Sequence, residues 1–221
     1  MSARVGVLMF PGSLDDRDLG RSFGLLGADV RMVWHKDTRL PELDGIAAPG
    51  GFSYGDYLRA GAMARFSPVM RAVLDFAASG RPVLGVCNGF QILCEAGLLP
   101  GALVRNRDLK FVCQDVRIVV EDPGQLRAEL PPGRDLVLPV KHGEGAYMPD
   151  PDHKPRVAFR YVGTNPNGST DDIAGVANEA GNVVGLMPHP EYAVDPLLGS
   201  TDGAPLLRSF MAACLAARTR R

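Results

Sequence analysis

Cys87 stands between two glycines, where an apolar run gives way to a helix-like pattern, in the segment Gly85-Val86-Cys87-Asn88-Gly89. This spacing has the form of a nucleophile elbow, the G-x-S-x-G turn from a strand into a helix, with cysteine in place of serine. So sharp a turn strains its middle residue and brings the residues two positions away against other backbone, so both must be small. Unpaired amides at the start of the helix would stabilise a thiolate. The pattern predicts a nucleophilic thiol, and the alternative is a buried, unreactive cysteine.

A thiolate that transfers acyl groups needs a base, and His189 is the best placed of the four histidines. It directly follows an apolar strand pattern, so it would share the sheet edge of Cys87 if that strand is parallel. Pro188 and Pro190 should hold the segment extended, which points His189 and Glu191 to the same side. A carboxylate there would orient the imidazole and stabilise its cation. We therefore expect a Cys-His-Glu triad, the alternative being that His-Pro-Glu is only a polar turn.

The other histidines are weaker candidates for the base. His142 has Glu144 at the corresponding spacing, but it lies among strands expected to be antiparallel, where it could still line the same cleft. His35 ends a predicted strand with no elbow near it in sequence. His153 falls in a segment typical of a solvated loop.

Two backbone amides are candidates for an oxyanion hole. Gly50 and Gly51 follow the third predicted strand and can turn an amide toward the thiol, and the amide of Asn88 is the second expected donor. Taken alone, Pro-Gly-Gly would indicate a simple turn.

Alternating strands and helices must position these groups. Strand patterns cover 4–10, 28–34, 44–51 and 81–87, and helical patterns cover 15–27 and 67–80, the latter with Ser67 as cap and Pro68 at its first position. This order predicts an α/β fold with an open, mostly parallel sheet flanked by helices. From about Lys110 the strand patterns follow one another and should add antiparallel pairs at one side, in 109–120, 135–143, 156–162, 172–178 and 182–187. A terminal helix over 203–221 should dock on this single domain, residues 1–221.

The composition excludes several classes of protein. The 221 residues carry 24 Lys and Arg against 25 Asp and Glu, with no basic run for nucleic acid. No apolar stretch is long enough to cross a membrane and no signal peptide is recognisable, so we expect a cytoplasmic protein without a membrane partner. The cysteines at 87, 94, 113 and 214 are too scattered for a metal knuckle, which favours free thiols and no metal.

Together these segments resemble class I (triad) glutamine amidotransferases, whose fold is flavodoxin-like. Pro49-Gly50-Gly51, the elbow through Gln91, and His189-Pro190-Glu191 occur in the family's order along the whole chain. The stretches PGGFSYGDYLRAGAMARF, PVLGVCNGFQILCEAGLLPGALVRN, HGEGAY, NPNGS and IAGVANEAGNVVGLMPHPE are similar to the glutaminase subunits of phosphoribosylformylglycinamidine synthases. The resemblance covers the chain from about Val5 to the terminal helix.

The resemblance implies an enzyme that hydrolyses glutamine to glutamate and ammonia for purine (IMP) synthesis. Cys87 would attack the amide, His189 would act as acid and base, and Glu191 would orient it. Gly51 and Asn88 would hold the oxyanion, and substrate contacts would fall to Gly50, Gln91 and His142.

The partners implied are a large synthetase subunit, which uses ATP and Mg and receives the ammonia through a channel, and a small bridging subunit. No cofactor is expected in this chain, because neither a P-loop nor a dinucleotide-binding motif occurs. Phe52, Tyr54, Tyr57 and Arg59 could form a docking face or pack locally.

The chain departs from the family pattern in two places, neither of which falls on a triad position. Ser13-Leu14-Asp15-Asp16 replaces the frequent Ser-Asn-Cys-Asp, and Tyr192 replaces an Arg after His-Pro-Glu. We expect these differences to act at the cleft rim, at the partner contact or on how Glu191 is held. Two other functions stay open at this point: a free-standing cysteine hydrolase of the same fold, and a binding module with an unreactive thiol.

Overall fold

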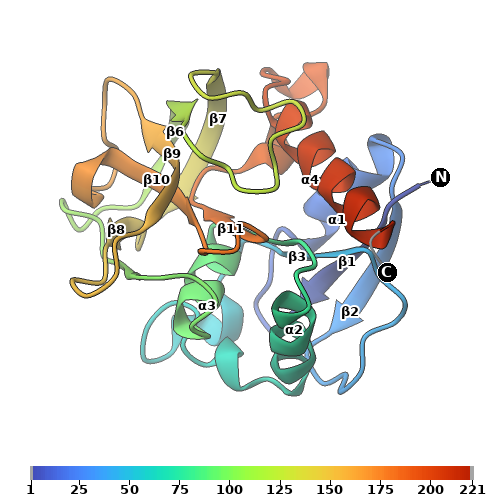
Figure 1. Ribbon diagram of the computed structural model, residues 1–221. Helices are drawn as coiled ribbons and strands as arrows, with labels where there is room; N and C mark the ends of the chain where they lie inside the picture. The colour runs from blue at the N-terminus through green and yellow to red at the C-terminus, as the bar shows by residue number, and fades with distance from the viewer. Residues whose placement is uncertain (1, 220–221) are drawn as a thin grey trace.

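Nine strands form one mixed sheet in the computed structural model, which describes residues 2–219 (Figure 1). Its strand order is β2-β1-β3-β4-β11-β10-β9-β6-β7. The strands are β1 (Arg4–Met9), β2 (Asp29–Trp34), β3 (Gly45–Ala48), β4 (Val83–Val86), β6 (Val112–Val120), β7 (Asp135–His142), β9 (Arg156–Tyr161), β10 (Ile173–Ala177) and β11 (Val183–Leu186). Strands β5 (Ala102–Val104) and β8 (Ala146–Met148) form a separate antiparallel pair, which the sequence patterns did not indicate.

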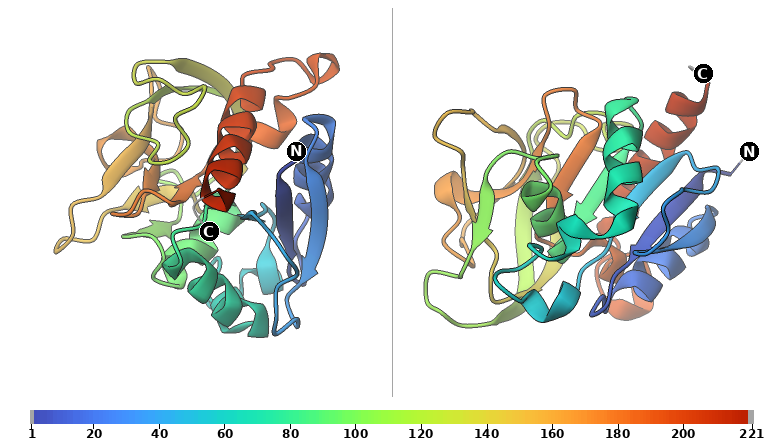
Figure 2. Two further views of the ribbon diagram at one scale, coloured as in Figure 1. Left: turned by 45° about the vertical axis from the view of Figure 1, so that its right-hand side comes forward. Right: turned by 90° about the horizontal axis from the view of Figure 1, so that it is seen from below.

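Helices cover both faces of the parallel part of the sheet (Figures 1 and 2). Helix α1 (Asp16–Leu25) and helix α4 (Gly203–Arg218) lie on one face, where the rings of Phe23 and Phe210 are in contact. Helix α2 (Pro68–Ala78) and helix α3 (Asn88–Glu95) lie on the other face. The α/β class and the open, mostly parallel core are therefore confirmed, with one large apolar cluster running along the sheet.

The second half of the chain adds antiparallel strands at one side of the sheet, as predicted, with one exception. β11 pairs in parallel with β4, register Leu186 to Val86, and antiparallel with β10. β11 thus adds the expected antiparallel pair with β10 and, in addition, a parallel pair with β4, because its all-buried sequence fits the centre of the sheet and not an edge. This placement is what brings the segment after β11 beside the segment after β4.

Two local expectations need comment. Ser67 occupies the N-cap position of α2, but its side chain makes no capping bond and instead pairs with the hydroxyl of Tyr54 at 2.9 Å. The predicted terminal helix is present as α4, while residues 220 and 221 of that prediction lie outside the described residues. Among residues 2–219, no helix combines the length and the apolar character needed to cross a bilayer.

Helix α3 lies unusually close to the sheet because glycines face the contact. A Cβ added to Gly89 would lie 2.0 Å from the carbonyl oxygen of Ala48 in β3. A Cβ added to Gly85 would lie 2.8 Å from the backbone of Gly89. The two glycines that flank Cys87 thus have the steric role that the sequence predicts for an elbow.

We expect Gly89→Ala to lower the free energy of unfolding by about 3 kcal/mol, because the rigid backbone of β3 cannot move away from the added methyl group. Chemical denaturation of the purified chain measures this. Gly24→Ala is the matched control: Gly24 lies in α1 with nothing within 4 Å of its added Cβ, so helix propensity should stabilise that variant by up to about 1 kcal/mol. Equal effects of the two substitutions would contradict the packing argument.

Candidate active site

Cys87 sits in the strained turn that its sequence predicts. It follows the last residue of β4 and serves as the N-cap of α3, with φ 50° and ψ −107°, a conformation that non-glycine residues rarely adopt. Its backbone amide donates to the carbonyl of Leu186 at 2.8 Å, which ties the turn to β11. Such strain persists only where the surrounding structure enforces it, and it is typical of nucleophiles presented above a sheet.

His189 and Glu191 follow β11, directly beside the elbow. The Nδ1 atom of His189 lies 2.7 Å from Oε1 of Glu191, and both side chains are buried. The same-side contact is as predicted, but the prediction of an extended segment is wrong beyond His189: His189 is extended, whereas Pro190–Tyr192 forms a 3₁₀ turn. The contact between the carboxylate and the ring therefore does not come from the alternation of an extended strand, since the chain bends at Pro190.

The environment of His189 favours its charged form. Burial alone would lower the pKa of His189, but Glu191 and Cys87 outweigh it and raise this pKa to about 10. Cys87 contributes to this shift both through the charge of its sulfur and as a hydrogen-bonding partner. No hydrogen bond of ordinary geometry ends at Nε2 of His189 in residues 2–219, which leaves that atom available to exchange a proton.

A cavity of about 290 Å³ opens over Cys87, at the small end of the range for ligand sites. Its lining includes Gly51, a predicted donor to the oxyanion, together with charged and aromatic side chains. Its lining consists of Leu14, Asp15, Gly51, Phe52, Asp56, Cys87, Gln91, Phe111, Lys141, His142, Gly143 and Glu144. Gly51 has φ 136° and packs against the backbone of Gly12, so only glycine fits there.

The side chain of Gln91 lines this cavity, and the side chain of Asn88 holds it in place. Asn88 accepts from the amide of Ser53 at 3.1 Å and donates to Gln91 at 2.8 Å. Gln91 in turn donates to the carbonyl of Glu144 at 2.5 Å. These bonds join α3 to the loop after β7 and fix the shape of the space above the sulfur.

His142 lines the same cavity, as the sequence allowed, but its surroundings do not suit a base. It lies beside Asn106, with Nδ1 3.2 Å from the side-chain oxygen, and beside Asn167, 3.5 Å from Nε2. Burial and the nearby His189 lower the pKa of His142 to about 4. The His142 ring therefore stays neutral near pH 7, and its contacts with Asn106 and Asn167 hold the start of the loop that follows β7.

The structure also places the remaining candidates. Gly50 is absent from the cavity lining and lies instead between His189 and Asp15, where an added Cβ would be 2.8 Å and 2.3 Å from their atoms. His35 is buried and bonds the hydroxyl of Tyr54 at 2.7 Å. His153 is exposed, as expected for a solvated loop, and pairs with Asp150.

Of the four residues considered for a docking face, Tyr54 packs locally and Arg59 forms an ion pair at the surface. Tyr54 is held by His35, and Arg59 makes two bonds to Glu95 at 2.6 Å and 2.7 Å. Phe52 and Tyr57 are exposed on the loop beside the cavity.

The partners that surround His189 were not evident from the sequence patterns. Asp15, which the sequence shows only as a departure at the cleft rim, has its carboxylate 3.7 Å from Nδ1 of His189, and that position is buried and not at a rim. Lys141 pairs with Asp15 at 2.6 Å. The departure at Tyr192 also bears on the site, since its hydroxyl is 2.8 Å from Asp15. The sequence signal that could have indicated these partners was the pair of departures from the family pattern, since Asp15 and Tyr192 are in contact.

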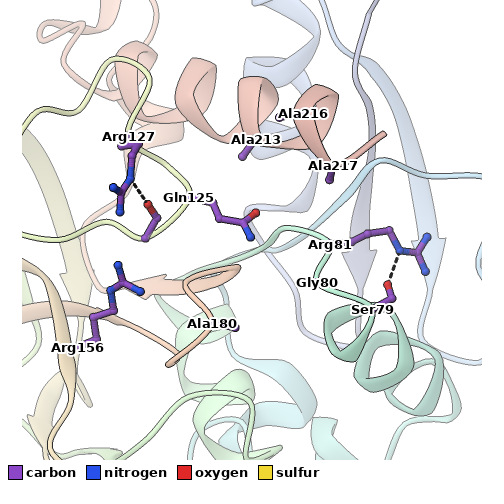
Figure 3. A pocket seen from close by; sticks show the side chains of 11 residues that line it. Ser79, Gly80, Arg81, Gln125, Arg127, Arg156, Ala180, Ala213, Ala216 and Ala217 are labelled. Atoms are coloured by element: carbon purple, nitrogen blue, oxygen red, sulfur yellow. Dashed lines mark hydrogen bonds between the residues drawn. The ribbon is translucent and has the colours of Figure 1, made fainter. Parts of the chain in front are cut away.

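A wider hollow of about 840 Å³ lies at the opposite edge of the sheet, between the end of α2, the end of α4 and the segments before β4 and β11 (Figure 3). Its arginines are already used by the protein: Arg81 bonds Ser79, Arg127 bonds the carbonyl of Gly124, and Arg156 pairs with Asp122. Among residues 2–219, its lining holds no cysteine and no histidine, whereas catalytic groups gather at the carboxyl ends of parallel strands. The cavity over Cys87 is therefore the candidate active site.

Comparisons with known proteins agree with this geometry. Residues 2–204 match the family described as the CobB/CobQ-like glutamine amidotransferase domain. Phosphoribosylformylglycinamidine synthase subunit PurQ of Rubrobacter xylanophilus is 55% identical over 95% of this chain and 98% of its own length, and that of Frankia casuarinae is 52% identical over 97% and 96%.

Among solved structures, a chain of PurLQS from Thermotoga maritima superimposes with a TM-score of 0.91 at 41% identity, covering 96% of this chain and 99% of that one. A protein of Thermoplasma acidophilum described as a GMP synthase component shares the fold, with a TM-score of 0.73 at 18% identity over 100% of this chain and 98% of that one.

The lowered pKa of His142 makes the fold sensitive to acid. In the unfolded chain the His142 ring takes up a proton near pH 6.5, but in the folded chain only near pH 4. The free energy of unfolding therefore falls as the pH drops from 6.5 to 4, and the contribution of the neutral ring is fully present above pH 6.5. We expect wild type to lose about 3 kcal/mol more than His142→Gln between pH 7 and pH 4, measured by urea unfolding. The control His153→Gln, at an exposed site, should follow wild type; a parallel curve for His142→Gln would contradict the assignment.

Proposed function

Because the chain belongs to the CobB/CobQ-like glutamine amidotransferase family, and within it to the PurQ subunits of phosphoribosylformylglycinamidine synthase, we propose that Cys87, His189 and Glu191 hydrolyse the side-chain amide of glutamine. The chain is an enzyme with glutamine amidotransferase activity, the glutaminase subunit of this synthase in purine biosynthesis.

The first step forms a thioester. The Cys87 thiolate attacks the amide carbon of glutamine, and the amides of Gly51 and Asn88 receive the negative charge that develops on oxygen. His189, held protonated by Glu191, gives its proton to the departing nitrogen, and the C–N bond breaks to release ammonia. Cys87 is left acylated by the glutamyl group.

The second step restores the enzyme. The now neutral imidazole of His189 takes a proton from water, which adds to the thioester carbon while the same oxyanion donors act again. The C–S bond breaks, glutamate leaves, and the thiolate and imidazolium are regenerated. Gln91 and His142 would seat the substrate by shaping the cavity, and Gly50 would do so indirectly by its close contact with His189.

One observation carries the proposal: the strained elbow and the His-Pro-Glu segment follow two adjacent parallel strands, β4 and β11. Residues more than one hundred positions apart thereby meet at one edge of the sheet. The nucleophile, the proton carrier and the orienting acid are all present beside a cavity of suitable size.

The partners are those of the relatives. The chain acts with PurL, which is the synthetase, and with PurS, and glutamine is its substrate. We further propose that it needs no cofactor of its own, that ATP and Mg serve the synthetase, and that ammonia reaches the synthetase through a shielded channel. A cytoplasmic location fits this role and is likewise part of the proposal.

Cys87→Ala should abolish glutamine-dependent activity of the reconstituted complex by at least about 10³-fold, while added ammonia still supports the synthetase, because only the nucleophile is lost. Product formation with each nitrogen source measures this. Cys113→Ala, at an exposed thiol on β6, is the control and should behave like wild type. Failure of ammonia to rescue Cys87→Ala would refute the role of Cys87, and strong turnover by the isolated chain, unaffected by the synthetase, would favour a free-standing hydrolase.

A glutamine analogue carrying an electrophile should modify Cys87 selectively, although Cys113 is the more exposed thiol, because only Cys87 lies in the cavity beside His189. Peptide mapping by mass spectrometry after a short exposure of the complex locates the adduct. Modification of the exposed Cys113 without modification of Cys87 would indicate a binding module with an unreactive thiol.

A further inference from the structure

Asp15 supplies a second carboxylate on the side of His189 that faces Glu191. Its Oδ2 atom lies 3.7 Å from Nδ1 of His189, within ion-pair distance, and the side chain is 3% exposed. Gly50 separates the two groups, and no larger residue fits, because an added Cβ would lie 2.3 Å from Oδ2 and 2.8 Å from Cε1 of the ring. The backbone at Gly50 thus sets how closely the carboxylate approaches the imidazole.

The other oxygen of Asp15 is fixed by two partners. Oδ1 accepts from Nζ of Lys141 at 2.6 Å and from the hydroxyl of Tyr192 at 2.8 Å. The same hydroxyl is 2.8 Å from Asp18 and 3.1 Å from Lys141, whose ammonium also lies 4.3 Å above the tyrosine ring. Burial, together with Asp15 and Asp18, raises the pKa of Tyr192, so it remains a neutral donor.

The charges around the His189 ring decide whether the Asp15–Lys141 pair stabilises the protonated or the neutral imidazole. Cys87 faces the imidazole from the turn before α3 and His142 from the end of β7, and Glu191, Tyr192, Asp15 and Lys141 also lie around it. Asp15 and Lys141 together carry no net charge, but Oδ2 of the carboxylate lies within ion-pair distance of Nδ1 while Lys141 binds the other carboxylate oxygen, Oδ1. The pair therefore presents its negative end to His189.

We propose that Asp15, held by Lys141 and Tyr192, is a positioning residue that orients His189 and favours its protonated form for the glutaminase reaction. The proposal rests on the function assigned to His189 above. Asp15 acts through the imidazole and not on the substrate carbon. Asp15, Lys141 and Tyr192 do not take over the role of Glu191, which keeps its direct 2.7 Å bond to Nδ1 of His189. Asp15 adds a second attraction to Nδ1 over a longer distance.

A cation site is the competing interpretation of this cluster. Asp15, His189 and Glu191 offer ligand atoms that all lie within 4.8 Å of one another. However, Nδ1 already bonds Glu191, and the ammonium of Lys141 already neutralises Asp15 at 2.6 Å. The cluster thus contains its own cation, and a metal would have to displace it.

Titration of His189 by NMR tests the proposal without relying on glutaminase activity. In the full chain labelled with ¹⁵N-histidine, the His189 signal is assigned by its absence in His189→Gln. Asp15→Asn keeps the shape of the side chain but leaves Lys141 as an uncompensated cation beside the ring, so the midpoint of the His189 titration should fall by about one unit or more. An unchanged midpoint overturns the proposal.

Lys141 provides the discriminating variants. Lys141→Met leaves the charge of Asp15 uncompensated, so the midpoint should move up, opposite to Asp15→Asn. The double variant Asp15→Asn/Lys141→Met removes both charges and should recover at least half of the shift caused by Asp15→Asn. Shifts in the same direction for both single variants, with no recovery in the double, would indicate a purely structural role and overturn the proposal.

Asp16→Asn is the matched control, since it removes the same charge at the neighbouring position in the first turn of α1, outside the network. Its midpoint should stay at the wild-type value, and an equal shift would mean that any nearby charge suffices. In the reconstituted complex, the alkaline limb of kcat/KM for glutamine should move down with Asp15→Asn while ammonia-dependent activity stays unchanged. A shifted NMR midpoint without a shifted limb would instead contradict the role of His189 in the proposed function.

Discussion

The contact between the backbones of α3 and β3 is the constraint on which the candidate site depends. Gly89 lies so close to the carbonyl of Ala48 that no side chain fits, and this closeness forces the chain to turn sharply at Cys87. The turn places the thiol at the N-cap of α3, above the edge of the sheet. A hydrogen bond from its amide to Leu186 then fixes the elbow against β11. The position of the thiol thus follows from one steric requirement.

Charge balance is the second organising feature. A buried imidazolium is costly unless anions surround it, and His189 has Glu191 in direct contact, the Cys87 sulfur within reach and Asp15 at 3.7 Å. Lys141 offsets the added carboxylate, so the cluster does not accumulate negative charge. The neighbouring His142 avoids repulsion by staying neutral, and its asparagine partners keep it in place. The site therefore separates one charged and one neutral histidine by their surroundings.

Local sequence patterns predicted most elements and the elbow. The apolar runs before Cys87 and His189 are short and bounded by glycine and proline, so their identity as buried strands is readable. The role of the glycines around Cys87 follows from sterics that any sharp strand-to-helix turn obeys. Predictions failed where a residue's neighbour in space decides its behaviour: Ser67 bonds Tyr54 instead of capping α2, and the short pair β5 and β8 forms only through mutual contact.

By itself, the sequence determined that a thiol is held in a strained turn, that a histidine with a carboxylate two positions on follows a buried strand, and that the two belong to one mostly parallel sheet. Only the tertiary structure decided that β11 enters the sheet in parallel beside β4, which brings these groups together. It alone revealed that Asp15, Lys141 and Tyr192 converge on His189. The physical reason is that steric and periodic constraints act between near neighbours in the chain, whereas strand order and ion pairing depend on long-range packing that no local pattern records.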